Sequence, residues 1–245
     1  MQNTKNSDSL ITQFKITPFD TPRNGAVAIA TATFYDMFKV NGITIMESSN
    51  GNLYVKMPQK RTLQGAYIDV THPLNADTRK KINETLLSAY SSGVLQQEFA
   101  IDTKPEVTAQ YSVKNKPEEL GNTLGRLDIV VKDMVIHNCK IINSKDDKAM
   151  MIFPVYKNRN GDYYPIIKAT STSVFQEMNS AALAEFNTEY SYKKLGDNEL
   201  SVLKNSGIKF ISHRTPEGDN IVKFNTSDLQ KINNALSPVM AQTQK

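Results

Sequence analysis

The sequence predicts an α+β fold in which antiparallel strands precede a helix, and it predicts this arrangement twice. In the first 57 residues, short runs alternate apolar and polar side chains, as half-buried strands do. Turn signals such as Asn50-Gly51 separate these runs and supply the positive φ angles that tight hairpins need. From Ile82 to Tyr90, apolar residues recur at helical spacing instead. The N-terminal third is therefore expected to be an antiparallel sheet followed by one helix.

Each expected element has a local reason. Strands are expected over 11–16, 26–34, 38–46, 53–57 and 66–70, with a turn-rich loop over 18–25 and a basic loop after Pro58. His72-Pro73 is expected to stop the strand at 66–70, because the residue before proline is pushed away from helical angles. Asn75 is a good helix N-cap, and Asp77 places an anion in the first turn, where the helix dipole favours it.

Basic residues gather around this strand and the start of the helix. They are Lys56, Lys60, Arg61, Arg79, Lys80 and Lys81, against Asp69 and Asp77 in the same window. The window therefore carries a net charge of +4, which equals the net charge of the whole chain. Such side chains neutralise phosphates, and a helix N-terminus adds backbone N–H donors. The alternative is an ordinary solvated charged face.

The same stretch resembles the SpoVG family, named for stage V sporulation protein G, a small bacterial regulator. The matching residues are Met57-Pro58, Lys60-Arg61, Gly65, Tyr67, Asp69, His72-Pro73, Asn75, Thr78-Arg79, Lys81-Ile82 and Ala89-Tyr90, with 11–16 and 33–40 resembling the first strands. The resemblance covers roughly the first 90 residues. It implies a small α+β protein that dimerises through its strands, binds DNA and in some cases RNA, and regulates gene expression, septation and sporulation. It also implies that binding residues lie at Lys60, Arg61, Arg79, Lys80 and Lys81.

A weaker repeat of this pattern follows 96 residues later. At that offset, Gly25 matches Gly121, Ile45 matches Ile141, Met57-Pro58 matches Phe153-Pro154, Gly65 and Tyr67 match Gly161 and Tyr163, and Ile82, Leu87 and Tyr90 match Met178, Leu183 and Phe186. We therefore predict repeat 1 over 1–92, a connector over 93–106 and a diverged repeat 2 over 107–190, fused as a pseudo-dimer. The alternative is two unrelated α+β segments whose turns match by accident. In repeat 2 a helix is expected from Ser173, with Gln176 completing a capping box.

The two predicted copies differ in charge. The six basic positions of repeat 1 correspond to Ile152, Tyr156, Lys157, Phe175, Gln176 and Glu177, of which Lys157 alone is basic. This difference suggests that repeat 1 meets an anionic partner, while repeat 2 is scaffold or contacts another protein. The apolar Ile152, Tyr156 and Phe175 are alternatively buried against the C-terminal unit. Repeat 2 lacks the His-Pro-Leu-Asn and Thr-Arg-Lys-Lys strings, which argues against symmetric binding at two sites.

Residues 191–245 are predicted to be a small C-terminal helix–hairpin–helix unit. The segment 191–197 is expected to be a linker, followed by a short helix with Leu200 and Leu203 that ends near Gly207. Two strands are expected around a turn at 216–219, and Ser227 is expected to cap a last helix. A unit of this size is marginally stable alone, so it is expected to dock on the repeats or on a partner.

The sequence offers little for catalysis. It has no Gly-rich phosphate loop, HExxH, GxSxG or metal-spaced Cys/His set, so no enzyme activity, metal or cofactor is expected. The histidines His72, His137 and His213 are expected to be structural or solvent-exposed, and Cys139 to face a core. Beyond Tyr67 no aromatic set lies near the basic cluster, so base stacking is not expected there. With no signal-peptide or membrane-length apolar run, a bacterial cytoplasmic location is expected.

Together these observations predict a non-enzymatic nucleic-acid-binding regulator, for DNA and potentially RNA, that binds phosphates through the basic loop and helix start of repeat 1. The alternative is a protein-interaction adaptor, acting in septation or in a mobile element, whose basic patch meets an acidic protein. A protein partner is expected at repeat 2 or at the C-terminal unit, and no membrane contact is expected. The fused chain is expected to be a monomeric pseudo-dimer or a homodimer.

Overall fold

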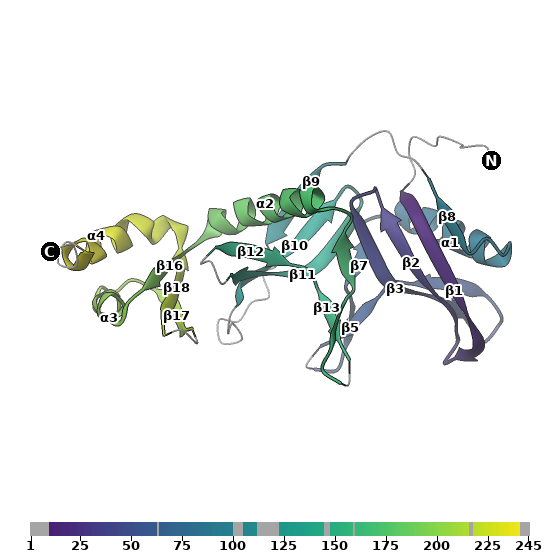
Figure 1. Ribbon diagram of the computed structural model, residues 1–245, viewed down its shortest axis with the longest axis horizontal. Coiled ribbons are helices and arrows are strands. Elements are labelled where there is room, and N and C mark those ends of the chain that lie inside the picture. Colours follow the sequence, from purple (N-terminus) through teal and green to yellow (C-terminus); the bar gives the residue numbers. More distant parts are fainter. Residues whose placement is uncertain are drawn as a thin grey trace. The chain divides into compact units, whose positions relative to one another are not determined.

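The computed structural model describes residues 10–62, 64–99, 105–111, 123–144, 148–158, 160–215 and 218–240. Within these residues it combines helices with antiparallel strands, so the predicted α+β class is confirmed (Figure 1). The chain forms two compact units. The first contains 1–109, 128–139 and 153–178, and the second contains 110–127, 140–152 and 179–245. Among the described elements, three strands and one helix have residues in both units.

The first sheet is built mainly from the N-terminal strands. These are β1 (Ile11–Arg23), β2 (Ala26–Phe34), β3 (Phe38–Glu47), β4 (Leu53–Lys56) and β8 (Gln96–Glu98), joined by β15 (Ile167–Ala169). The strand order is β15-β3-β2-β1-β8, and β4 also pairs with β3. β8 lies within the predicted connector 93–106, where the apolar residues show neither helical nor strand spacing. On β2 the small residues Ala28, Ala30 and Ala32 are buried, which allows close packing on that face.

The helix α1 (Ala76–Ser91) covers this sheet and contacts β1, β4 and the strand β7 (Thr71–Pro73). Asn75 is its N-cap, as predicted, and its side chain accepts a hydrogen bond of 2.8 Å from the backbone N–H of Thr78. Ile82 and Leu86 are fully buried and Ala89 nearly so. The helical spacing of the apolar residues thus identified the face that packs on the sheet.

The strand predicted at 66–70 does end before His72-Pro73, at Asp69, but these two residues were not expected to belong to a strand themselves. Residues 71–73 form β7, which pairs antiparallel with β11 (Met134–Asn143), with His72 opposite Val135 and Pro73 opposite Met134. The restriction that proline places on the preceding residue favours extended angles, and these are strand angles. Proline at the last position of a short strand costs little ladder bonding, because β7 ends there.

Strands from distant parts of the chain are exchanged reciprocally in the first unit. β7 pairs with β11, while β15 pairs with β3. Thr71 lies opposite Ile136, and Ile167 lies opposite Val40; each member of the first pair is 96 residues from its counterpart in the second. The backbone agrees, because the N–H of Asn41 donates to the Ile166 carbonyl and the N–H of His137 donates to the Val70 carbonyl, each at 2.8 Å.

Other elements recur with the same spacing. β3 and β11 begin and end 96 residues apart, as do β4 and β12 (Ala149–Ile152). The hairpin of β5 (Gln59–Arg61) and β6 (Tyr67–Asp69) recurs as β13 (Val155–Lys157) and β14 (Tyr163–Pro165), again at 96 residues. β10 (Thr123–Val131) lies 97 residues after β2. The second sheet has the order β12-β11-β10-β9, where β9 is Val107–Tyr111.

The helix α2 (Thr172–Glu189) begins earlier than predicted. The hydroxyl of Ser171 accepts a hydrogen bond of 3.2 Å from the N–H of Val174, so Ser171 performs the capping role that the sequence suggested for Ser173. Both are serines near the helix start, but Val174 stands three residues after Ser171, so Ser171 caps the helix without the reciprocal contact of a capping box. Met178, Ala182 and Phe186 are buried, as expected for the apolar face.

The C-terminal segment contains one strand more than predicted. It comprises β16 (Tyr190–Leu195), α3 (Asp197–Asn205), β17 (Phe210–Arg214), β18 (Asn220–Asn225), a 3-10 turn (Thr226–Asp228) and α4 (Leu229–Met240). The expected linker at 191–197 is mostly β16, which pairs with β18 along its whole length. This pairing joins residues about 30 positions apart, so no local pattern revealed it. The N-cap before α4 is Asn225, which accepts from Ser227, rather than Ser227 itself.

A separate core lies within this C-terminal segment. It contains Leu195, Leu200, Leu203, Val222, Phe224, Ile232 and Leu236. Leu203 and Leu236 belong to α3 and α4, so the two helices share one apolar cluster with the three-stranded sheet β16-β18-β17.

Some predicted positions lie outside the described residues: Gly121, residues 100–104 of the connector, and Pro216 and Glu217 of the expected turn. Among the described residues, no helix combines the length and apolar character needed to cross a membrane.

Candidate nucleic-acid interface

The basic loop of the sequence is a short β-ribbon. β5 and β6 pair so that Lys60 lies opposite Ile68 and Arg61 lies opposite Tyr67. Gly65 closes the ribbon with φ of +86°, a conformation that side chains with a Cβ rarely adopt. Lys60, Arg61 and Tyr67 are all exposed. The ribbon therefore presents two cations and an aromatic ring to solvent.

Asp69 connects this ribbon to the helix. One carboxylate oxygen accepts 2.8 Å from the Gln59 side-chain amide, and the other lies 4.0 Å from the Arg79 guanidinium. Arg79 is half-buried. The charge of Arg79 is thus directed inward, toward the ribbon.

The three consecutive basic residues at the helix start do not share a face. Successive helical residues are rotated by about 100°, and Thr78 and Ile82 point into the core. Lys80 is consequently on the solvent side, where its Nζ lies 3.8 Å from Glu84 one turn later. Arg79 and Lys81 flank it on opposite sides. The sequence window ended before Glu84, so it overstated the free charge of the helix.

The N-terminus of α1 also offers less to an anion than expected. The Thr78 N–H already donates to the Asn75 side chain. The Asn75 side-chain amide in turn donates 3.3 Å to the carboxylate of Asp133, and Asp77 occupies the first turn. Protein carboxylates therefore already stand where a phosphate would benefit from the helix dipole.

The structure thus divides the six predicted residues. Arg79 and Lys80 face carboxylates, whereas Lys56, Lys60, Arg61 and Lys81 are exposed and have no ion pair with any described acid. The Arg61 side chain donates one long hydrogen bond of 3.4 Å to the Gly65 carbonyl and stays exposed. The exposed cations of the β5–β6 ribbon are the most available part of the predicted site.

Two of the three histidines meet, although they are 65 residues apart. His137 Nδ1 lies 2.7 Å from an Asp128 carboxylate oxygen, and His137 Nε2 lies 3.2 Å from His72 Nδ1. Burial lowers the pKa of His72, and neighbouring His137 lowers it further. The pairing of β7 with β11 brings the two rings together, which the sequence could not indicate. The two imidazoles and the Asp128 carboxylate thereby link β7, β11 and β10.

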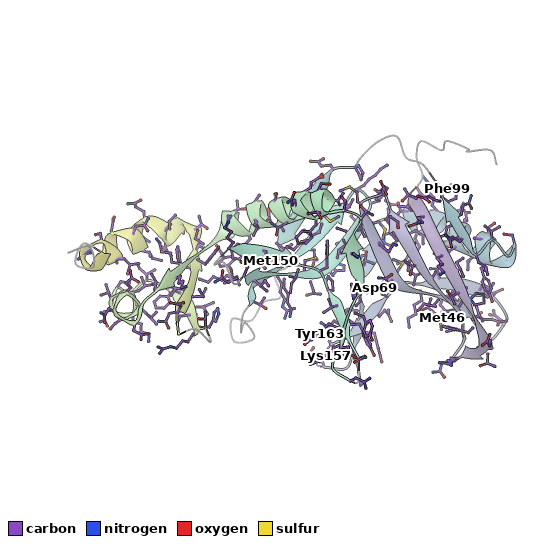
Figure 2. All side chains as sticks on the ribbon, in the orientation of Figure 1. Met46, Asp69, Phe99, Met150, Lys157 and Tyr163 are labelled. Atoms are coloured by element: carbon purple, nitrogen blue, oxygen red, sulfur yellow. The ribbon has the colours of Figure 1, made fainter. Side chains whose placement is uncertain are left out.

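The second ribbon carries an exposed set of tyrosines that was not predicted from the sequence. Tyr156, Tyr163 and Tyr164 of β13–β14 are 58%, 64% and 53% exposed. Tyr156 was one of the residues for which burial was left open as an alternative, and its side chain is exposed on the ribbon. Figure 2 shows Tyr163 and Lys157 on this ribbon, and the Lys157 ammonium lies 5.1 Å from the centre of the Tyr163 ring. The Asn160-Gly161 turn signal flanked by tyrosines was the available clue.

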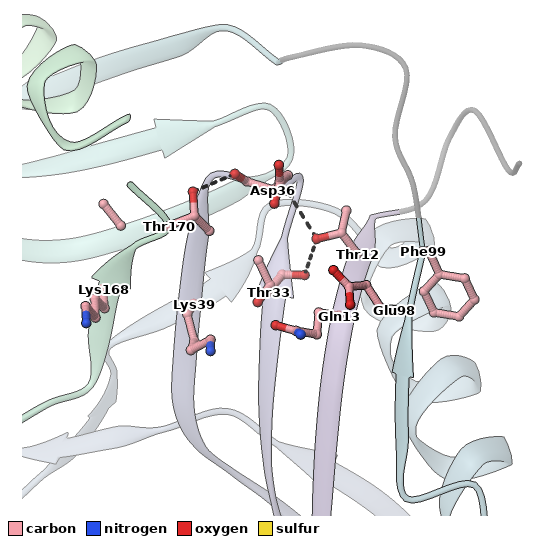
Figure 3. Close-up of a pocket in the computed structure, with 10 residues that line it drawn as sticks. Thr12, Gln13, Thr33, Asp36, Lys39, Glu98, Phe99, Lys168 and Thr170 are labelled. Atoms are coloured by element: carbon pink, nitrogen blue, oxygen red, sulfur yellow. Dashed lines mark hydrogen bonds between the residues drawn. The ribbon is translucent and has the colours of Figure 1, made fainter. Parts of the chain in front are cut away.

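The first sheet also has a polar pocket of about 260 Å³ (Figure 3). Lys39 and Lys168 lie directly opposite each other on β3 and β15 and both line it. Such like-charged cross-strand pairs are unfavourable, but Asp36 and Glu98 line the same pocket and balance the two lysines in formal charge. The pocket is therefore not a strongly basic site.

The described part of the chain includes one cysteine, Cys139, together with acidic and histidine side chains. No group of three or more His, Cys, Asp or Glu side chains there is arranged to hold a metal ion. Cys139 is fully buried, and burial raises the pKa of its thiol far above the ordinary value. Its thiolate, the reactive form, is therefore strongly disfavoured.

Comparison with known proteins supports the family resemblance. The SpoVG family model matches residues 10–92. The chain is 44% identical over 63 residues to "Putative septation protein SpoVG 2" of Listeria monocytogenes serotype 4b (strain F2365), covering 26% of this chain and 61% of that protein. It is 42% identical over 62 residues to the SpoVG protein of Acholeplasma laidlawii (strain PG-8A), covering 25% and 65%.

A SpoVG protein of Clostridium botulinum (strain Alaska E43 / Type E3) is 38% identical over 71 residues, which cover 29% of this chain and 77% of that protein. The match thus spans about three fifths of the Listeria protein and more than three quarters of the clostridial one. On the family model and this coverage, the chain belongs to the SpoVG family.

Proposed function

We propose that this chain is a non-enzymatic nucleic-acid-binding regulator that binds phosphates through the β5–β6 ribbon and the start of α1. The observation that carries the proposal is the exposure of Lys60 and Arg61 on a narrow two-stranded ribbon, without ion pairs to any described acid. Arg and Lys at such positions neutralise phosphates and release counterions. A two-stranded ribbon is also narrow enough to enter a DNA major groove.

The relatives are named as septation proteins. We extend this role to the chain as part of the proposal: its nucleic-acid binding serves the control of septation or sporulation. The exposed charge on the ribbon is the support for nucleic-acid binding. The names of the relatives are the support for a role in septation.

We further propose that residues 107–190 are a diverged second copy of residues 1–92, so that the chain forms an internal pseudo-dimer. The support is the reciprocal pairing of β7 with β11 and of β15 with β3, together with ribbons and helices at the same spacing. Sedimentation equilibrium checks the consequence. A monomer of 27.4 kDa is expected, because each copy already supplies the strand that the other requires.

The proposal is tested by fluorescence anisotropy with labelled DNA and RNA, from about 50 mM to about 200 mM salt. The informative variant is Lys60→Glu/Arg61→Glu, since these side chains are exposed and have no acidic partner among the described residues. The matched control is Lys148→Glu/Lys209→Glu, an equal charge change at exposed sites of the second unit. Loss of two phosphate contacts should lower the salt slope by about 1.4 for single strands and about 1.8 for duplex.

Binding that vanishes in the Lys60/Arg61 variant and persists in the control supports the proposal. Equal losses in both variants would show only that net charge matters. No binding at low salt would refute the proposal and favour the adaptor alternative, in which the same ribbon meets an acidic protein.

A further inference from the structure

Each ribbon places a basic side chain opposite a tyrosine at the same register. Arg61 lies opposite Tyr67 on the first ribbon, and Lys157 lies opposite Tyr163 on the second. The two tyrosines are 65% and 64% exposed. Of the six basic positions in 56–81, Arg61 is the one whose counterpart 96 residues later is also basic. The cation that recurs is thus the one that faces a tyrosine.

The second ribbon adds a further aromatic pair. Tyr156 lies opposite Tyr164. Because side chains alternate between the faces of a strand, this pair lies on one face, and Lys157 with Tyr163 lies on the other. Single exposed apolar residues are ordinary, but three exposed tyrosines spread over the two faces of one short ribbon point to binding rather than to packing.

The chemistry of this surface fits unpaired nucleotides. Exposed aromatic rings stack on bases that are free of a duplex, and an adjacent cation binds the backbone phosphate. The acid nearest in the ribbon, Asp162, accepts 2.9 Å from the Asn158 side-chain amide and so holds the turn. Lys157 consequently has its partner in the ring of Tyr163, which leaves its ammonium accessible to a phosphate.

We propose that the β13–β14 ribbon is a stacking surface for unpaired bases of single-stranded nucleic acid, with Lys157 contacting the phosphate. This inference rests on the proposed function and adds to it a second site and a preference for single strands. Duplex bases already stack on one another, so the tyrosines contribute little to duplex binding.

The test compares the full-length chain with the Tyr163→Ala/Tyr164→Ala variant. The probes are a labelled single-stranded pyrimidine oligonucleotide, as DNA and as RNA, and a blunt duplex. Tyr163→Phe/Tyr164→Phe keeps the rings, and Tyr54→Ala removes an exposed tyrosine of similar setting from β4. Loss of one stacked base should weaken single-strand binding at least about fivefold. The affinity of the alanine variant for the duplex should equal that of the wild type. The phenylalanine variant and the Tyr54 variant should bind single strands with wild-type affinity.

Equal weakening for single strands and duplex, no weakening, or failure of the phenylalanine variant to retain binding would each overturn the inference. If the wild type binds nucleic acid while the alanine variant matches it, the inference fails and the proposed function stands. If the wild type binds neither probe, both fail. Sedimentation velocity adds a separate outcome. If the variant changes its association state while its affinity for nucleic acid stays the same, the tyrosines form a contact between two molecules of this protein, and the inference is overturned.

Discussion

Replacing Asp69 by Asn should strengthen nucleic-acid binding. Asp69 lies 4.0 Å from Arg79, and both side chains are about one third exposed. Solvent-screened pairs of this kind contribute about 0.2–1 kcal/mol, so their loss costs little stability. Asn keeps an oxygen that accepts the hydrogen bond from the Gln59 amide, which preserves the ribbon geometry. The substitution therefore frees the Arg79 guanidinium from its ion pair. It also removes a negative charge next to the β5–β6 ribbon, where phosphates are proposed to bind.

The size of the effect follows from counterion release. One additional phosphate contact steepens the slope of log affinity against log salt by about 0.7 for single strands and about 0.9 for duplex. At about 0.1 M salt this corresponds to an affinity gain of about five- to eightfold. The assay is anisotropy across a salt series, with thermal unfolding to confirm that the stability loss stays within about 1 kcal/mol.

Asp197→Asn is the matched control, because Asp197 forms a similar exposed pair with Arg214 at 3.2 Å in the C-terminal segment. This variant makes the same charge change away from the proposed site and should leave affinity and salt slope unchanged. An Asp69→Asn protein with unchanged or weaker binding and an unchanged slope would refute the idea that Asp69 restrains Arg79.

Three further outcomes are expected. Because the pKa of His72 is lowered in the folded protein, the unfolded chain binds a proton at this residue more readily. The free energy of unfolding should therefore fall as the pH drops below about 6.5. The His72→Gln variant should show a smaller fall in urea titrations at several pH values. If the stability of the His72→Gln variant depends on pH as that of the wild type does, another group causes the loss of stability at low pH. His213 is one such group, since burial also lowers its pKa. Leu86→Ala removes a fully buried side chain of α1 and should cost about 2–5 kcal/mol in urea unfolding; a loss below about 1 kcal/mol would contradict the packing described. Cys139 should react with a thiol reagent only after denaturation, and rapid labelling of the native protein would contradict its burial.

Local signals in the sequence account for much of the fold. The Asn75 cap, the apolar face of α1 and the glycine turns depend on neighbours within one turn or hairpin, and these were predicted correctly. The strands β7 and β16 were missed because their partners lie far along the chain: residue 72 pairs with 135, and 190 with 225. No window of neighbouring residues contains that information.

The candidate site divides in the same way. Charge clustering located Lys60 and Arg61, and the spacing of Lys80 and Glu84 is a four-residue pair that the sequence already displays. The contact between Arg79 and Asp69 depends on how the ribbon meets the helix, so it required the structure. The exposure of the three tyrosines on β13–β14 likewise required the structure.

The reciprocal strand exchange constrains how the chain is made. Val40 of β3 pairs with Ile167 of β15, which is synthesised 127 residues later. At about 5–20 residues per second this delay lasts about 6–25 s. During that time the edge of β3 at Phe38–Val40, which β4 does not cover, offers unpaired backbone groups to any strand within reach, including one on a neighbouring nascent chain. We therefore expect translation speed and the spacing of ribosomes on the message to influence correct folding, alongside the stability of the finished protein.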